Sequence, residues 1–137
     1  MPFMKLLRLL RYIWALPNSI IGLLLLPLSL ASGGEAHIVG GVLEISGTAV
    51  ARALALIPFC GSAEALTLGH VVLAGSEEIM DRWRSHERMH VLQYELWGPF
   101  FIPAYFWSSL VARMKGKDGY LGNRFEAEAF LRQRDIT

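Results

Sequence analysis

Cysteine and net charge are both scarce in this sequence of 137 residues. The one cysteine, Cys60, excludes a disulfide bond within the chain, and its default role is that of a small buried apolar side chain. Thirteen Lys and Arg residues against twelve Asp and Glu give a net charge of +1, which excludes the basic surface that nucleic-acid binding needs. The length allows one globular domain at most. Hydrophobic residues, in contrast, make up 53% of the chain, which is high for a soluble domain and indicates a membrane.

The N-terminal segment accounts for much of this hydrophobic excess. Lys5, Arg8 and Arg11 precede residues 12–30, a stretch of nineteen residues without a charged side chain. About twenty such residues cross a bilayer as a helix. We therefore predict a membrane-anchoring segment at residues 1–32 and a separate folded unit at the residues that follow.

Three interpretations of this segment remain open. The favoured one is a signal anchor that spans the membrane, with the basic residues in the cytoplasm and the chain after Ser32 facing outward. The second is a cleaved signal peptide, because the basic start and the sequence Ala31-Ser32-Gly33 roughly fit a processing site. The third is a helix, or a helical pair bent at Pro17 or Pro27, that lies in the membrane interface without spanning it.

After the anchor the pattern changes to that of strands. Residues 36–39 and 42–46 flank Gly40-Gly41, which predicts a β-hairpin. Residues 66–74 read as a third strand, so we expect a small antiparallel sheet. An extended peptide substrate could add as a strand beside 66–74, since strand addition supplies backbone hydrogen bonds without requiring a particular sequence.

The next segment is predicted to be a long helix. Ser76 is followed by two glutamates, as at a helix N-terminus where a hydroxyl caps the backbone and the helix dipole favours acidic residues. Apolar and aromatic residues then recur at spacings of three and four as far as Trp97. Gly98-Pro99 ends the helix.

This helix carries the most informative motif of the chain, HExxH, which reads His86-Glu87-Arg88-Met89-His90. Positions i and i+4 lie on one helix face, so both imidazoles can bind one metal ion. Glu87 projects from the edge of that face, where it can accept a proton from a metal-bound water. The motif therefore predicts a zinc site with a general base beside it.

An aromatic segment follows the motif helix at residues 97–112, interrupted by Pro99 and Pro103. Aromatic residues of this density are typical of the headgroup boundary of a membrane, and Arg113 and two following lysines could meet anionic lipids. A core helix packed behind the metal site is an equally good interpretation. We expect a membrane-proximal helix that can serve both roles.

The third metal ligand has to come from elsewhere in the chain, because an open catalytic zinc site uses three protein ligands. His37, His70 and Cys60 are candidates by residue type. The glutamates within residues 123–130 are better candidates, since this segment is rich in strong helix formers.

With these residues the sequence resembles the gluzincin clan of metallopeptidases, in which HExxH is followed by a glutamate ligand on a later helix. It is most similar to small bacterial membrane-associated proteins whose HExxH helix runs into a Trp-Gly-Pro turn. The resemblance covers residues 86–103 and 123–130, with a looser likeness over residues 66–76. It implies that His86 and His90 are zinc ligands and that Glu87 is the general base.

The later motif of the clan is Glu, two variable residues, Ala and usually Asp. With Ala129 in the alanine position, the resemblance implies that Glu126 is the third ligand. Phe130 departs from the pattern, because the clan usually has there an acid that supports a ligand histidine. Loss of such a partner commonly weakens metal affinity or activity. Glu128 is the alternative ligand or takes the supporting role.

The sequence thus predicts an α+β protein with five parts in order: a membrane-anchoring helix, a small antiparallel sheet, the HExxH helix, an aromatic membrane-proximal helix and a C-terminal ligand helix. Residues 33–137 would form a minimal zincin-like metal-binding domain, and the resemblance implies the bacterial inner membrane with this domain on the periplasmic side. We expect a zinc-dependent metalloendopeptidase; Tyr94, Tyr120 and His70 are unranked candidates for stabilising the transition state. The alternative functions are an inactive metal-binding protein and an accessory subunit that packs against a larger membrane protein.

Overall fold

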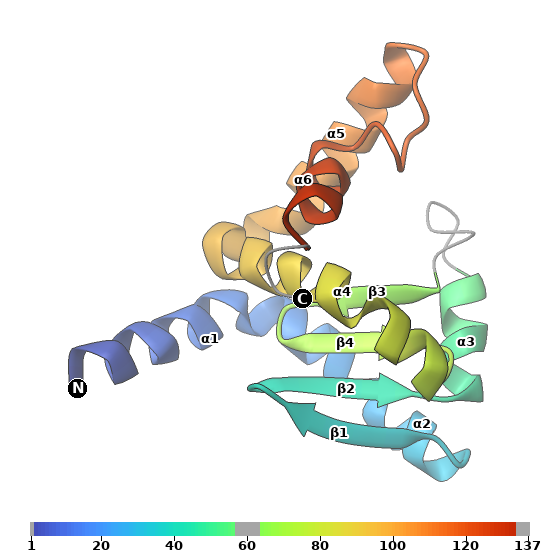
Figure 1. Ribbon diagram of the computed structural model, residues 1–137. Coiled ribbons are helices and arrows are strands. Elements are labelled where there is room, and N and C mark those ends of the chain that lie inside the picture. The colour runs from blue at the N-terminus through green and yellow to red at the C-terminus, as the bar shows by residue number, and fades with distance from the viewer. Residues whose placement is uncertain (1, 57–63, 134–137) are drawn as a thin grey trace.

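The computed structural model describes residues 2–56 and 64–133, so Cys60 lies outside the described residues. The fold is α+β, as predicted, and is shown in Figure 1. Its elements are, in chain order, α1 (Pro2–Leu23), α2 (Leu26–Ala31), β1 (Glu35–Val39), β2 (Val42–Ser46), α3 (Thr48–Ala55), β3 (Ala65–Leu68), β4 (Val71–Ala74), α4 (Glu77–Trp97), the 3-10 turn η2 (Gly98–Phe100), α5 (Phe101–Met114) and α6 (Arg124–Arg132).

The sheet has four strands in the order β1-β2-β4-β3. The hairpin of β1 and β2 around Gly40-Gly41 is confirmed. The prediction of a purely antiparallel sheet is wrong, because β4 pairs with β2 in parallel. The prediction of one strand at residues 66–74 is also wrong: Gly69 and His70 form a turn, and β3 and β4 form a second antiparallel hairpin. β3 begins at the end of the sheet where β2 stops and runs antiparallel to β4, so β4 runs in the direction of β2.

Each face of the sheet has its own apolar core. One face packs against α4, in a cluster of Val42, Val72, Ala74, Met80 and Val91. The other face packs against α3 and the start of α2, in a cluster around Ile45, Val50, Leu54, Val71 and Leu73. Alternate residues of β2 and β4 therefore point to opposite helical layers, which is why these strands are buried on both sides.

Helix α1 and helix α2 form the predicted apolar N-terminal segment. Within the described residues, Pro2–Ala31 is the one segment long and apolar enough to cross a membrane, and only 28% of its most apolar window is buried in the protein. The second half of α1 nevertheless packs against the end of the sheet and α4: Asn18 Nδ2 donates to Gly98 O at 3.0 Å, and His70 N donates to Ser19 Oγ at 2.9 Å. Its first half projects away from the sheet (Figure 1).

Helix α4 ends at Gly98, and η2 leads directly into α5. Helix α5 points away from the sheet, and α6 returns along it to reach α4 (Figure 1). The return is fixed by Asn123, whose Oδ1 accepts from Phe125 N at 2.8 Å to cap α6. Its Nδ2 donates to Tyr105 O and to Ser109 Oγ, both at 2.8 Å. This fully buried amide therefore sets the position of α6 on α5.

Candidate metal centre

The motif lies in the middle of α4, as predicted. Ser76 caps the helix, because its Oγ accepts from Ile79 N at 3.2 Å. His86, Glu87 and His90 are all buried, and one ligand atom from each lies within 4.8 Å of the others. The four-residue spacing on a helix thus places both imidazoles and the carboxylate at one point.

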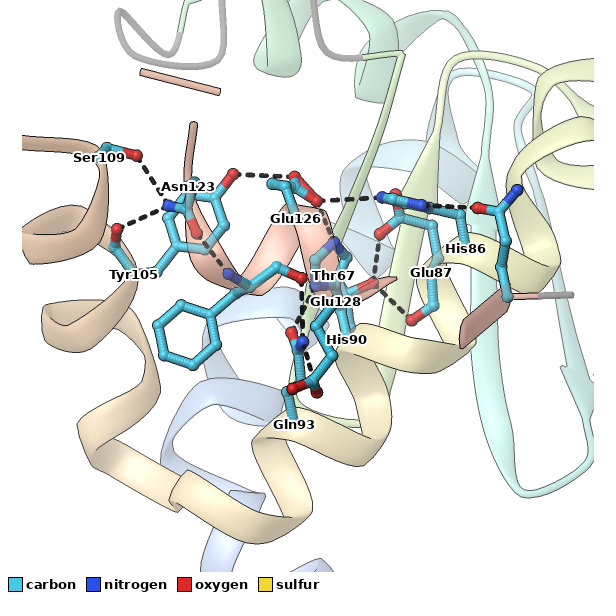
Figure 2. Close-up of polar contacts among 12 residues, drawn as sticks. Thr67, His86, Glu87, His90, Gln93, Tyr105, Ser109, Asn123, Glu126 and Glu128 are labelled. Atoms are coloured by element: carbon cyan, nitrogen blue, oxygen red, sulfur yellow. Dashed lines mark hydrogen bonds and ion pairs between the residues drawn. The ribbon is translucent and has the colours of Figure 1, made fainter. Parts of the chain in front are cut away.

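Glu126 of α6 joins this group. Its Oε1 lies 3.0 Å from His86 Nε2 and 2.5 Å from His90 Nε2. Figure 2 shows the three side chains pointing toward one another. The other carboxylate oxygen, Oε2, accepts from the Tyr105 hydroxyl at 3.0 Å. Helix α6 therefore brings to the histidines the glutamate that the resemblance named.

Glu128 is placed differently. It is exposed, and its Oε1 accepts from Gln93 Nε2 at 3.2 Å. It does not reach either Nε2, so among the two glutamates of α6 it is Glu126 that the fold brings to the histidines. Glu128 instead supports the amide that bonds to His90.

Each histidine is held from behind by a side-chain amide. His86 Nδ1 lies 2.9 Å from Gln133 Oε1, and His90 Nδ1 lies 2.8 Å from Gln93 Oε1. Because an amide oxygen only accepts, both Nδ1 atoms donate, and the Nε2 atoms are directed at Glu126. Phe130 packs against the His86 ring, with centroids 4.3 Å apart and the ring planes tilted by 49°. The supporting bond that the resemblance placed at Phe130 thus comes from Gln133, one turn later.

The charges of this cluster are strongly coupled. Burial by itself would raise the pKa of Glu126, but hydrogen bonds with His86 and His90 lower that pKa to about 2. Burial by itself would lower the pKa of His90, but the hydrogen bond with Glu126 raises that pKa to about 9. His90 and Glu126 therefore form a charge-assisted pair in this structure.

The donor set fits zinc. Two imidazole nitrogens and one carboxylate oxygen are the ligands of a common class of open catalytic zinc site. Ligands about 2.0 to 2.1 Å from a tetrahedral zinc lie about 3.3 Å from one another. The distances to Glu126 Oε1, 3.0 and 2.5 Å, are shorter than this, as expected for atoms joined by hydrogen bonds, so zinc would need the three groups to move apart. The amide behind each imidazole supplies the hydrogen bond that zinc-binding histidines use to fix the ring.

Glu87 lies next to this cluster, but its carboxylate is hydrogen-bonded to β3. Its carboxylate is bonded by the Thr67 hydroxyl of β3 at 2.5 Å. Burial raises the pKa of Glu87, with smaller opposing effects from His90 and Thr67. A raised pKa makes a carboxylate a stronger base, which suits the predicted role.

A cavity of about 660 Å³ opens beside Glu87, His90 and Glu126. Its lining is mainly apolar and aromatic. It is formed by Glu87, His90 and Glu126 together with Ile21, residues 64–68, Arg82, Trp83, Tyr94, Phe101, Ile102, Tyr105, Phe106 and Tyr120. β3 forms one wall and is the outermost strand of the sheet on that side. A ligand in this cavity would therefore lie between a strand edge and the metal centre.

The three candidate stabilisers lie in different places. Tyr94 and Tyr120 line the cavity, but the Tyr94 hydroxyl donates to Thr67 O at 2.9 Å. His70 lies away from the cavity, with Nε2 2.8 Å from Glu95 Oε2. Sequence reasoning did not select Tyr105, whose hydroxyl donates a hydrogen bond to Glu126 Oε2. It also missed the two glutamines, although the spacing of three between His90 and Gln93 is a signal that places both on one helix face.

The sequence matches no protein-family model, no curated protein and no solved structure. The function is therefore inferred from the geometry of the site.

Proposed function

We propose that the protein is a membrane-associated zinc-dependent metalloendopeptidase. The observation that carries this proposal is the convergence of His86, His90 and Glu126 at one point, with Glu87 buried beside them and an open cavity lined by Glu87, His90 and Glu126. Residues 33–137 would form the zincin-like unit, and residues 1–32 its membrane attachment.

A zinc ion held by these three side chains would polarise the scissile carbonyl and lower the pKa of a water molecule towards about 7. Glu87 accepts the proton of the attacking water and passes it to the leaving amine, so that the proton is conserved over the reaction. The Thr67 hydroxyl holds the Glu87 carboxylate in position during this transfer. Tyr105 and Tyr120 are the hydroxyl groups best placed to stabilise the developing oxyanion.

The cavity also suggests the substrate class. An extended peptide could pair with the outer strand β3 and place apolar side chains against Leu66, Phe101 and Ile102. A protein segment exposed near the membrane would supply such side chains. The substrate we propose is therefore an extended apolar stretch of peptide.

We place the enzyme at the bacterial inner membrane, with the zincin-like unit on the periplasmic side. α1 and α2 supply the apolar segment that this requires. α5 adds a stripe of exposed apolar residues at helical spacing, which suits its proposed place next to the membrane: Phe106, Trp107, Leu110 and Met114. The alternative is a metal-binding accessory subunit without turnover, and the experiment below separates the two.

The test of turnover uses purified full-length protein loaded with one zinc. We expect it to cleave members of a peptide mixture, read by mass spectrometry, at sites flanked by apolar residues. Glu87→Gln should keep the zinc and lose about a hundredfold or more of the rate, as expected for loss of a general base. If the zinc-loaded protein cleaves no peptide and Glu87→Gln is indistinguishable from wild type in cells, the peptidase proposal fails. The accessory subunit is then the remaining interpretation.

The test of the ligand set uses a matched pair on α6. Glu126→Ala should lose most of the bound zinc, because it removes one of three ligands. Glu128→Ala should keep the zinc, because Glu128 reaches the centre only through Gln93. Zinc content by elemental analysis decides between the two, and the reverse result would reassign the third ligand.

A further inference from the structure

A second cavity, of about 840 Å³, lies on the other side of α4. Its walls are the first half of α1, the turn between β1 and β2, and the second half of α4. Glu87 and His90 line the first cavity, whereas Arg88, Leu92 and Glu95 line this one. The motif helix is thus a wall shared by two separate cavities.

The second cavity is lined by an excess of positive charge. Four basic side chains line it, Lys5, Arg8, Arg11 and Arg88, against the one carboxylate of Glu95. Glu95 already pairs with His70 at 2.8 Å. Arg88 Nη2 lies 3.3 Å from the buried Glu44 carboxylate. Within the part of the chain that the structure describes, the other three basic side chains, Lys5, Arg8 and Arg11, have no carboxylate partner. Basic side chains without counter-charges around a cavity are suited to an anion.

His70 gives an independent sign of a missing partner. It lines the same cavity, is 6% exposed and stacks on Tyr12. Its Nδ1 is buried and, within the described residues, has no hydrogen-bond partner. Buried polar atoms are nearly always paired, so this nitrogen indicates a ligand group. Because Nε2 faces the Glu95 carboxylate and so carries the ring proton, Nδ1 is an acceptor, and a hydroxyl of a lipid headgroup in the cavity would supply the donor.

The two faces of α1 are arranged as in a helix at a membrane surface. Ala15, Ser19 and Gly22 are buried against the protein. Arg11 and Arg8 continue the same face one and two turns earlier. The opposite face is apolar and faces outward, with Phe3 66%, Leu6 51%, Leu10 51% and Ile13 54% exposed. A basic face turned inward and an apolar face turned outward suit a helix lying in the interface of an anionic bilayer.

The contacts of α1 favour this orientation over a spanning one. Asn18 and Ser19 are hydrogen-bonded to η2 and to the turn between β3 and β4. A helix that crossed the bilayer would draw these partners and the buried His70–Glu95 pair into the hydrocarbon, where charged groups are costly. In the membrane plane, α1 can bury its apolar face while the sheet stays in water.

We propose that this second cavity binds the phosphate headgroup of an anionic phospholipid while α1 lies in the membrane plane above it. Lys5, Arg8, Arg11 and Arg88 bind the phosphate, which accepts hydrogen bonds from all four. Met4, Leu7 and Leu92 line the same cavity and contact the start of the acyl chains. The proposal deepens the membrane-associated part of the proposed function and does not depend on zinc or on turnover.

The first experiment measures partitioning of the full-length protein between water and vesicles of phosphatidylcholine with or without phosphatidylglycerol. Each basic residue near an anionic surface contributes about a fivefold factor, so the triple variant Lys5→Gln, Arg8→Gln, Arg11→Gln should lose about 100-fold on the anionic vesicles. It should bind pure phosphatidylcholine as the wild type does, because the apolar face is unchanged. The single variant Arg8→Gln should lose about fivefold and keeps the test decisive if the triple variant does not fold.

The matched control removes the same net charge elsewhere, at the exposed side chains Arg52, Arg124 and Arg132, each changed to Gln. It should keep the preference for anionic vesicles. An equal loss in this control would mean that net charge alone attracts the protein, and it would overturn the proposal. Glu87→Gln should bind lipid as the wild type does, so a failure of catalysis and a failure of lipid binding can be told apart.

The second experiment tests for a built site with soluble ligands. Dihexanoyl phosphatidylglycerol below its micelle concentration should bind the full-length protein in a saturable one-to-one manner, measured by calorimetry, and Arg88→Gln should weaken it at least fivefold. Dihexanoyl phosphatidylcholine should bind more weakly. Equal affinity for inorganic phosphate would assign the cavity to a free anion, and no saturable binding would mean that there is no site; either result overturns the proposal.

Discussion

At the scale of single residues, the candidate metal centre contains two amides that orient the histidines among its three proposed ligands. Gln93 and Gln133 each accept from the Nδ1 of one histidine. In both rings this leaves Nε2 as the atom directed at Glu126, and in His90 it is the atom that gains or loses a proton. A proton and a zinc ion therefore compete for the same position on His90.

This competition predicts how zinc affinity depends on pH. In protein stripped by a chelator, the pKa of His90 is raised to about 9 through Glu126. Below pH 9 zinc has to displace this proton, so its Kd should tighten about tenfold per pH unit from near neutrality up to about pH 9 and then level off. Calorimetry at pH 7 in buffers of different ionisation enthalpy should count about one proton released per zinc. A Kd independent of pH over this range would contradict the assignment.

The residues of the centre differ in how far sequence alone could find them. His86, Glu87 and His90 follow from helical spacing, which needs only local structure. Glu126 required the resemblance, because nothing local relates it to a helix 40 residues earlier. Gln133 and Tyr105 depend on how α5 and α6 fold back onto α4, and no pattern near them in sequence encodes that contact.

At the scale of elements, the segment at residues 65–74 shows where local reasoning fails. Its apolar run reads as one strand, yet Gly69 takes a φ of +65° and the chain reverses there. A glycine is needed in this turn because α1 passes directly against it. A Cβ atom on Gly69 would lie 2.7 Å from Ser19 N and 2.8 Å from Ala15 O. The strand break thus lies where α1 docks, and the apolar run itself does not reveal that contact.

The docking of α1 can be measured with two glycine substitutions. Gly69→Ala meets the backbone of α1, whereas Gly116→Ala has a similar φ of +76° and nothing within 4 Å. Gly116→Ala should therefore cost only the backbone strain, about 1 kcal/mol. Gly69→Ala should cost about 1 to 3 kcal/mol more, because it overpacks the contact with α1. Chemical unfolding of the full-length protein measures both free energies; equal losses would mean that α1 is not docked on this turn.

At the scale of the whole molecule, α4 joins three parts that are far apart in sequence. It covers one face of the sheet, contacts α1 near its C-terminal end and contacts α6 through the candidate metal centre. The α5–α6 hairpin has few other attachments, since it points away from the sheet (Figure 1). A metal ion bound by α4 and α6 would therefore stabilise the attachment of this hairpin to α4 and would not stabilise the sheet.

Zinc removal should consequently loosen one part of the molecule. A ligand present at about 1,000 times its Kd stabilises the bound state by about 4 kcal/mol. After chelation we expect faster hydrogen exchange at residues 101–133, by as much as about a thousandfold where opening breaks the link between α4 and α6. Exchange in β2 and β4 should change little, because their core contacts are to α3 and α4. Mass spectrometry of zinc-loaded and chelated protein measures both regions, and Glu126→Gln should respond weakly to the chelator. A uniform loss of protection would instead mean that zinc holds the entire fold together, since the sheet would then open with the hairpin.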